Sequence, residues 1–88
     1  MYTLYYTQEA KKDFKKITQF NLKHSCLRLL ALIKQDPLKS PPPYKKLKGA
    51  YVGMYSRRIN LQHRLFYEID EQNKRIKVLR MWSHYGDN

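Results

Sequence analysis

Residues 55–69, with the sequence YSRRINLQHRLFYEI, alternate apolar and polar side chains on both sides of a short polar interruption. Such alternation is typical of β-strands, in which successive side chains point to opposite faces of a sheet. It predicts strands over 51–59 and 62–69. The turn-forming sequence DEQN at 70–73 and a third apolar stretch at 75–83 extend the pattern. We therefore expect a β-meander in the second half of the chain.

Helical periodicity replaces this alternation in the first half of the chain. After a strand-like segment at 2–6 (YTLYY), Thr7 can cap a helix in which apolar residues recur on one face. Asn21 is a second candidate cap, and residues 22–35 have the spacing of a second amphipathic helix. Asp36 precedes a proline and ends this helix, because the residue before proline avoids the α region.

A proline-rich segment, PLKSPPP at 37–43, joins the helical half to the strand-rich half. It predicts a stiff, extended linker. The expected fold is α+β in the order β-α-α-β-β-β, with a twisted, mainly antiparallel sheet and both helices on one face. At 88 residues the chain is expected to form a single domain over 1–88.

The charge of the chain is strongly unbalanced. Lysine and arginine number 18 against 7 acidic residues, which gives a formal net charge of +11. Such a balance predicts a polyanionic partner such as nucleic acid. The sequence has no apolar run long enough to span a membrane and no signal-peptide pattern. Its one cysteine, Cys26, is expected to be a buried apolar residue in a reducing cytoplasm.

Strand parity separates a core side from an open side of the meander. Leu65 and Tyr67 share one side, whereas Arg64, Phe66 and Glu68 share the other. Arg58, on the preceding strand, is predicted on the same open side as Arg64. Two arginines on an open sheet face form a cradle for a phosphodiester.

Cleavage of RNA without a metal needs a base, an acid and cations that offset the charge on the phosphorane. No ligand spacing for a metal and no cofactor-binding motif occurs in the sequence. The second half of the chain supplies groups suited to cleavage, namely Arg57, Arg58, Arg64, Lys45, Lys46, Lys48, His84 and Tyr85. Basic sheets also bind RNA without cutting it, so composition alone leaves both functions open.

Three segments in order resemble one known family. Residues 55–69, the upstream PPPYKKLKG at 41–49 and the terminal RMWSHY at 80–85 are similar to the YoeB/Txe branch of the RelE-type toxins. This resemblance implies the toxin half of a bacterial toxin–antitoxin pair. Such toxins have a fold like that of microbial ribonucleases and cut messenger RNA in the ribosomal A site. It also implies contacts with ribosomal RNA, an acidic antitoxin that covers the site, and a homodimer as a possible assembly.

The resemblance also implies roles for individual residues. Arg58 and Arg64 correspond to phosphate-binding arginines, and Arg64 is the stronger candidate for stabilising the transition state. His84 corresponds to the general acid, Tyr85 to a substrate-contacting tyrosine and Lys48 to a phosphate-binding lysine. Lys46 and Arg57 are further candidates for substrate binding, and for Arg57 a structural role is the alternative.

Lys45 departs from the family pattern, because similar proteins usually have a glutamate, the expected general base, at this position. A lysine with an ordinary pKa near 10.4 is protonated at neutral pH and accepts no proton. Three accounts stay open: a detoxifying change, a lysine whose pKa is lowered by neighbouring cations, and proton transfer by His84 with cations doing the rest. The alternative function is a weakened or inactive toxin-like domain that binds RNA, ribosome and antitoxin.

Three further residues have two interpretations each. Glu68 is either a substitute base or, more commonly for a strand glutamate beside an arginine, a salt-bridge partner of Arg64. His63 has core-side parity and favours a hydrogen-bonded structural role. Trp82 is suited to stacking on a base and equally to packing in the core.

Overall fold

A computed structural model of the protein describes residues 1–82. One strand and two helices precede four further strands, with a single turn of 3-10 helix at Gly49–Tyr51. The elements are β1 (Thr3–Tyr6), α1 (Gln8–Gln19), α2 (Lys23–Gln35), β2 (Lys45–Lys46), β3 (Met54–Arg58), β4 (Arg64–Asp70) and β5 (Arg75–Arg80). The predicted order is confirmed, with β2 as a short additional strand.

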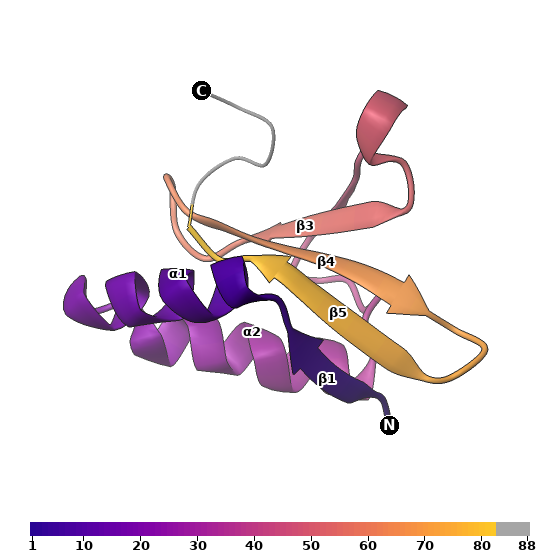
Figure 1. The fold of residues 1–88 in the computed structure, drawn as a ribbon, viewed down its shortest axis with the longest axis horizontal. Helices are drawn as coiled ribbons and strands as arrows, with labels where there is room; N and C mark the ends of the chain where they lie inside the picture. Colours follow the sequence, from indigo (N-terminus) through magenta and orange to yellow (C-terminus); the bar gives the residue numbers. More distant parts are fainter. Residues whose placement is uncertain (83–88) are drawn as a thin grey trace.

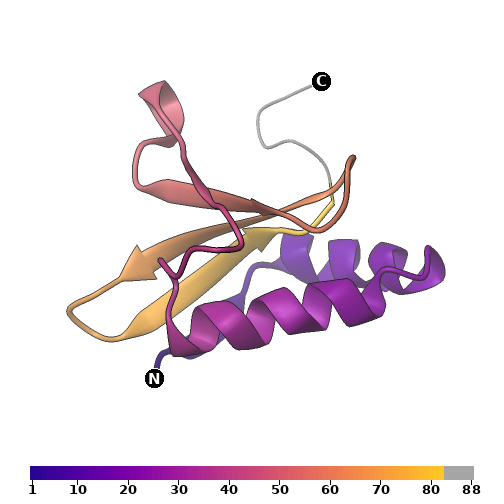
Figure 2. The same cartoon turned by 180° about the vertical axis from the view of Figure 1, so that it is seen from behind.

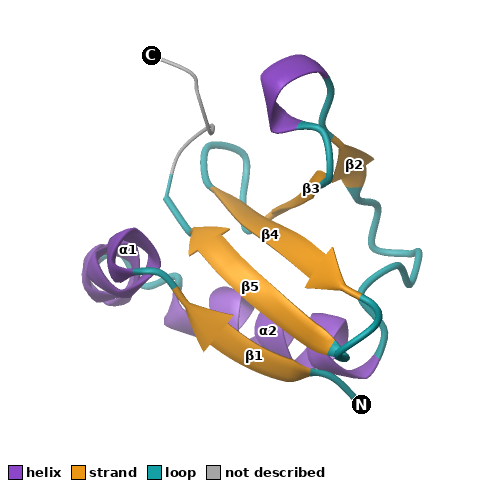
Figure 3. Ribbon diagram, turned by 45° about the vertical axis from the view of Figure 1, so that its right-hand side comes forward, coloured by secondary structure: helices purple, strands orange, loops and turns teal. Residues whose placement is uncertain are grey.

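The strands form one five-stranded sheet in the order β1-β5-β4-β3-β2. β1 runs parallel to β5, and every other neighbouring pair is antiparallel. Both helices lie on one side of the twisted sheet, as Figures 1 and 2 show from opposite directions. Figure 3 shows β1 beside β5, and β3 turning away from the helices towards β2. The α+β class and the helix-covered face are therefore confirmed.

The core lies between the helices and the sheet. Apolar residues at helical spacing on α1 and α2 meet alternate residues of β4 and β5. The fully buried members include Ala10, Ile17, Ile33, Leu65, Tyr67, Ile76 and Val78. This burial leaves the other side of β3, β4 and β5 without a helical cover. None of the helices in residues 1–82 is both long and apolar enough to cross a bilayer.

The ends of the helices agree only partly with the predicted caps. Thr7 caps α1 as expected, because its side chain accepts a hydrogen bond from the Ala10 amide at 3.0 Å. The prediction that Asn21 caps α2 is wrong. Asn21 has φ 58°, a left-handed conformation between the helices, and Leu22 takes the cap position without a side-chain hydrogen bond.

The segment between α2 and β3 differs from the predicted extended linker. The segment has a turn at 37–38 and a bend at 41–42, and the Ser40–Pro41 and Pro41–Pro42 peptide bonds are cis. β2 follows and pairs with β3 through two residues. The strand predicted from residue 51 begins only at Met54, because the 3-10 turn and Gly53, with φ 95°, come first.

The last strand contains an irregularity that its alternation did not reveal. Tyr67 pairs with Val78, but Phe66 pairs with Arg80, so Leu79 is an extra residue in β5. The bulge changes the parity of the strand after Val78. It therefore re-aims the residues that lead to the C-terminus.

Cys26 is fully buried, as predicted, and its thiol lies 3.4 Å from the Met81 sulfur. Burial raises the pKa of this thiol to about 11. We therefore expect the native protein to resist thiol reagents at pH 8, where only about one thiol in a thousand is ionised. Labelling with and without urea tests this, and rapid labelling of the folded chain would contradict the buried position.

Candidate functional site

The side of the sheet away from the helices carries a pair of arginines in direct register. Arg58 on β3 lies opposite Arg64 on β4, and the two side chains share this face. Arg64 is half-buried and donates from Nη1 to the Ser56 hydroxyl at 3.0 Å. Burial, and then the charge of Arg58, lower the pKa of the Arg64 guanidinium. Two cations placed opposite each other repel, and an anion bound between them relieves the repulsion.

Lys45 joins these arginines through the register of β2. It lies opposite Ser56, which shares the face of Arg58 and Arg64. We call Lys45, Arg58 and Arg64 the cationic face. Lys46 pairs with Tyr55 and is therefore on the opposite side of β2. The structure thus brings Lys45 to the predicted cradle and leaves Lys46 out of it.

Lys48 is exposed and precedes the 3-10 turn that follows β2. Phe66 lies on the same side of the sheet as the cationic face, but it is only 2% exposed and adds almost no open surface. Ser56 is also buried and was not singled out from the sequence. Its hydroxyl accepts the hydrogen bond that orients Arg64. This contact joins β3 to β4, where Ser56 pairs with Phe66, so the sequence alone does not reveal it.

Arg57 is buried on the side of the sheet away from the cationic face, which argues against its predicted role in substrate binding. Its side chain is 1% exposed on the core side of β3. Nε donates to the Tyr67 hydroxyl at 2.9 Å, and Nη1 donates to the Pro42 carbonyl at 2.7 Å. Nη2 donates to the carbonyls of Pro37 at 3.0 Å and Lys39 at 2.8 Å. Arg57 therefore holds the 37–43 segment against the sheet, an arrangement that agrees with the alternative structural role.

His84 and Tyr85 lie outside the described residues. The strand that leads to them is anchored by Asp13, a buried residue of α1 that sequence reasoning missed. Its carboxylate accepts from Arg80 Nε at 2.7 Å and from the Met81 amide at 3.1 Å. Phe66 pairs with Arg80 in antiparallel register. The last residue of β5 therefore lies close to the start of β4, where Arg64 is located.

Trp82 continues this anchorage. Its ring centroid lies 4.3 Å from that of His63 and 5.2 Å from that of Phe20, and the side chain packs against the core. His63 Nδ1 lies 3.0 Å from the Asn60 side-chain oxygen, which agrees with a structural role. Trp82 therefore lies next to His63, the residue that precedes Arg64, and is two residues before His84 in sequence.

Glu68 neither pairs with Arg64 nor lies near it. It is four residues further along β4, a separation of about 13 Å in a strand. A phosphate held by Arg64 is therefore beyond hydrogen-bond reach of this carboxylate, and the substitute-base interpretation loses its geometric basis. No group of three or more potential metal-ligating residues occurs within residues 1–82.

The repulsion between Arg58 and Arg64 is expected to lower the stability of the sheet. Replacing Arg58 by glutamine is expected to raise the free energy of unfolding by about 0.2–1 kcal/mol, since it removes like-charge repulsion. The same change is expected to weaken RNA binding. Urea unfolding and an RNA-binding titration measure the two effects. A loss of stability would show that Arg58 supports the fold rather than an anion site.

Comparisons with known proteins agree with this fold. The model of the family described as YoeB-like toxin of bacterial type II toxin-antitoxin system matches residues 4–85. The YoeB/ParE toxin from Agrobacterium tumefaciens superposes with a TM-score of 0.85 at 25% identity, covering 94% of this chain and 99% of that one. A comparison with curated protein sequences gave no match.

Two structures from Staphylococcus aureus are also similar. The YoeB of a YoeB–YefM complex has a TM-score of 0.80 at 32% identity, covering 97% of this chain and 99% of that one. A YoeB dimer has a TM-score of 0.80 at 31% identity, covering 96% and 98%. With a family match over nearly its whole length and relatives above 30% identity, the chain belongs to the YoeB-like toxins of bacterial type II toxin–antitoxin systems.

Proposed function

We propose that this chain is a ribosome-dependent, metal-independent endoribonuclease that cuts messenger RNA in the ribosomal A site and so inhibits translation in the cytoplasm. The observation that carries the proposal is the Arg58–Arg64 pair on the uncovered side of the sheet. Its like charges are held opposite each other, and β5 ends at the same edge of the sheet. Membership of the YoeB-like family supports a toxin with an RNA substrate.

In the proposed reaction the 2′-hydroxyl of one nucleotide gives its proton to a water molecule and attacks the adjacent phosphorus. The bond to the 5′-oxygen breaks, which leaves a 2′,3′-cyclic phosphate and a free 5′-hydroxyl. Arg64 and Arg58 stabilise the extra negative charge of the phosphorane. His84 protonates the leaving 5′-oxygen, Tyr85 contacts the substrate, and Lys48 binds a neighbouring phosphate. The resemblance, and the position of His84 two residues after Trp82, support the role of the imidazole.

A second candidate function follows from Lys45. Its side chain is exposed on the cationic face at the position where similar proteins have the expected base. An exposed ammonium favours phosphate binding over proton acceptance. In that case the chain binds RNA and the ribosome without cutting the RNA efficiently.

A translation extract programmed with a short message separates the two functions. Cleavage within the A-site codon by the natural chain supports the endoribonuclease. If Lys45 replaces a base, Lys45→Glu is expected to raise the cleavage rate at least about tenfold, because a positioned base contributes about 10²–10⁴-fold. Lys46→Glu is the matched control, since Lys46 lies on the other side of β2. Binding without cleavage by both the natural chain and Lys45→Glu contradicts the enzymatic function.

We further propose an acidic antitoxin protein as the physiological partner. Solved relatives were crystallised as a YoeB–YefM complex and as a YoeB dimer. The net charge of +11 favours an acidic partner over self-association through the cationic face. A homodimer through another surface is compatible with this assignment.

A further inference from the structure

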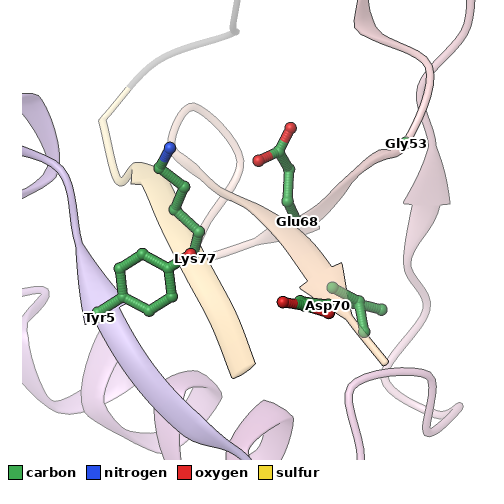
Figure 4. Close-up of a pocket in the computed structure, with 6 residues that line it drawn as sticks. Tyr5, Gly53, Glu68, Asp70 and Lys77 are labelled. Atoms are coloured by element: carbon green, nitrogen blue, oxygen red, sulfur yellow. The ribbon is translucent and has the colours of Figure 1, made fainter. Parts of the chain in front are cut away.

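A hollow of about 410 Å³ lies on the same side of the sheet as the cationic face, further along the strands. Its lining includes Tyr5, Gly53, Glu68, Asp70 and Lys77. Figure 4 shows Glu68 and Lys77 rising from the neighbouring strands β4 and β5, with the Tyr5 ring leaning towards β5 from β1. The hollow therefore combines two carboxylates, a lysine and an aromatic ring.

The register of the sheet explains why these side chains meet. Tyr5 lies opposite Lys77, and Lys77 lies opposite Glu68, so the three residues form one row across β1, β5 and β4. Alternation along β4 puts Glu68 on the same side as Arg64, two alternate positions away. An RNA strand with one phosphate on the cationic face can therefore bring a nearby base to this row.

The Glu68 carboxylate is unusual on so basic a protein. Asp70 is occupied by Asn73 and Arg75, whereas Glu68 makes no hydrogen bond or ion pair with any residue in the described part of the chain. Lys77 is likewise without an ion pair among residues 1–82, although it lies directly across from Glu68. The pair thus presents acceptors and donors side by side, both available to a ligand.

We propose that Glu68, Lys77 and Tyr5 form a base-recognition site that selects guanine in single-stranded RNA. The proposal rests on the proposed function and adds a specificity to it. The pairing edge of guanine presents the O6 acceptor beside the N1–H and N2–H₂ donors. Lys77 donates to O6, and the Glu68 carboxylate accepts from both N–H groups. Tyr5, which is 40% exposed, offers its ring for stacking.

The pattern discriminates against other bases. Adenine presents a donor where guanine has O6, so its amino group faces the Lys77 ammonium. Inosine keeps O6 and N1–H but lacks the 2-amino group and forfeits one bond to Glu68. A matched bidentate contact is worth about 1–3 kcal/mol of discrimination, equivalent to about 5- to 150-fold in affinity.

The test uses 2′-O-methyl oligouridines with one variable base, because a methylated 2′-oxygen prevents cleavage. Binding to the full chain is measured by fluorescence anisotropy at fixed salt, with NMR signals of Glu68 and Lys77 reporting the location. The guanine oligonucleotide is expected to bind at least about fivefold tighter than the adenine one, with inosine between them. Glu68→Gln is expected to abolish this preference, and Glu9→Gln, an exposed glutamate in the first turn of α1, is expected to keep it.

Equal binding of the three oligonucleotides, or a guanine preference that survives Glu68→Gln, would overturn the base site. Cleavage in a translation extract distinguishes this failure from that of the proposed function. A chain that cuts messages without regard to guanine contradicts only the base site. A chain that selects guanine but cuts no message contradicts only the endoribonuclease.

Discussion

Replacement of Arg57 by methionine is expected to lower the free energy of unfolding by at least about 3 kcal/mol, because each buried polar group left unsatisfied costs about 1–3 kcal/mol. The guanidinium serves three main-chain carbonyls and the Tyr67 hydroxyl. Methionine fills much of the space but donates no hydrogen bond. A domain of this size has a total stability of roughly 5–15 kcal/mol, so the variant loses a large share of it.

Arg58→Met is the matched control, since it changes the neighbouring arginine on the exposed side of the same strand. It is expected to leave stability unchanged or slightly raised. Urea unfolding followed by the fluorescence of Trp82, the single tryptophan, measures both variants. Equal losses from the two substitutions would refute the division between a structural and a substrate-facing arginine.

The Arg57 hydrogen bonds also bear on the site. They join residues 37, 39 and 42 to β3, and β2 begins three residues after Pro42. Lys45 reaches the cationic face because this segment returns the chain to β3. Arg57 is therefore a positioning residue for the site as well as a stabilising one.

The second large effect is expected on cleavage. Arg64→Ala is expected to lower the cleavage rate about 10²–10³-fold, the cost of removing one preorganised donor to a developing negative charge. Arg64→Lys is expected to retain part of the activity, because it keeps the charge but loses the planar pair of donors. Primer extension on the cut message measures the cleavage rate of both variants. Each variant is measured once with the natural Lys45 and once together with Lys45→Glu.

A loss of cleavage is attributed to unfolding only if the variant is less stable than the natural chain. Arg64 is half-buried and contacts Ser56, so unfolding curves are measured beside the cleavage rates. Ser56→Ala removes the hydroxyl that orients Arg64 and is expected to give a smaller loss than Arg64→Ala. Cleavage by Arg64→Ala at the natural rate would remove Arg64 from the reaction.

Much of this site was predictable because its signals are local. Alternation over residues 55–69 correctly put Arg58 and Arg64 on one face, since side-chain direction in a strand depends on parity alone. The same parity put Arg57 on the core side, where its charge argued against burial. Carbonyls contributed by residues 37–42 resolve that conflict, and no local pattern reveals them.

The missed features depend on contacts between distant parts of the chain. Asp13 lies among lysines on a helix and has the composition of a surface residue, yet its partners are 67 and 68 residues away. β2 has only two residues, too few for a periodic signal. The extra residue at Leu79 becomes visible only when β5 is aligned with β4.

The central claim is that an RNA phosphate binds between Arg58 and Arg64. The most direct measurement follows the side-chain Nε–H resonances of the arginines by NMR while a 2′-O-methyl RNA is added. The account predicts that the signals of Arg58 and Arg64 shift together and saturate, whereas that of the buried Arg57 stays in place. Shifts confined to the lysine-rich α1, with Arg58 and Arg64 unmoved, would contradict it.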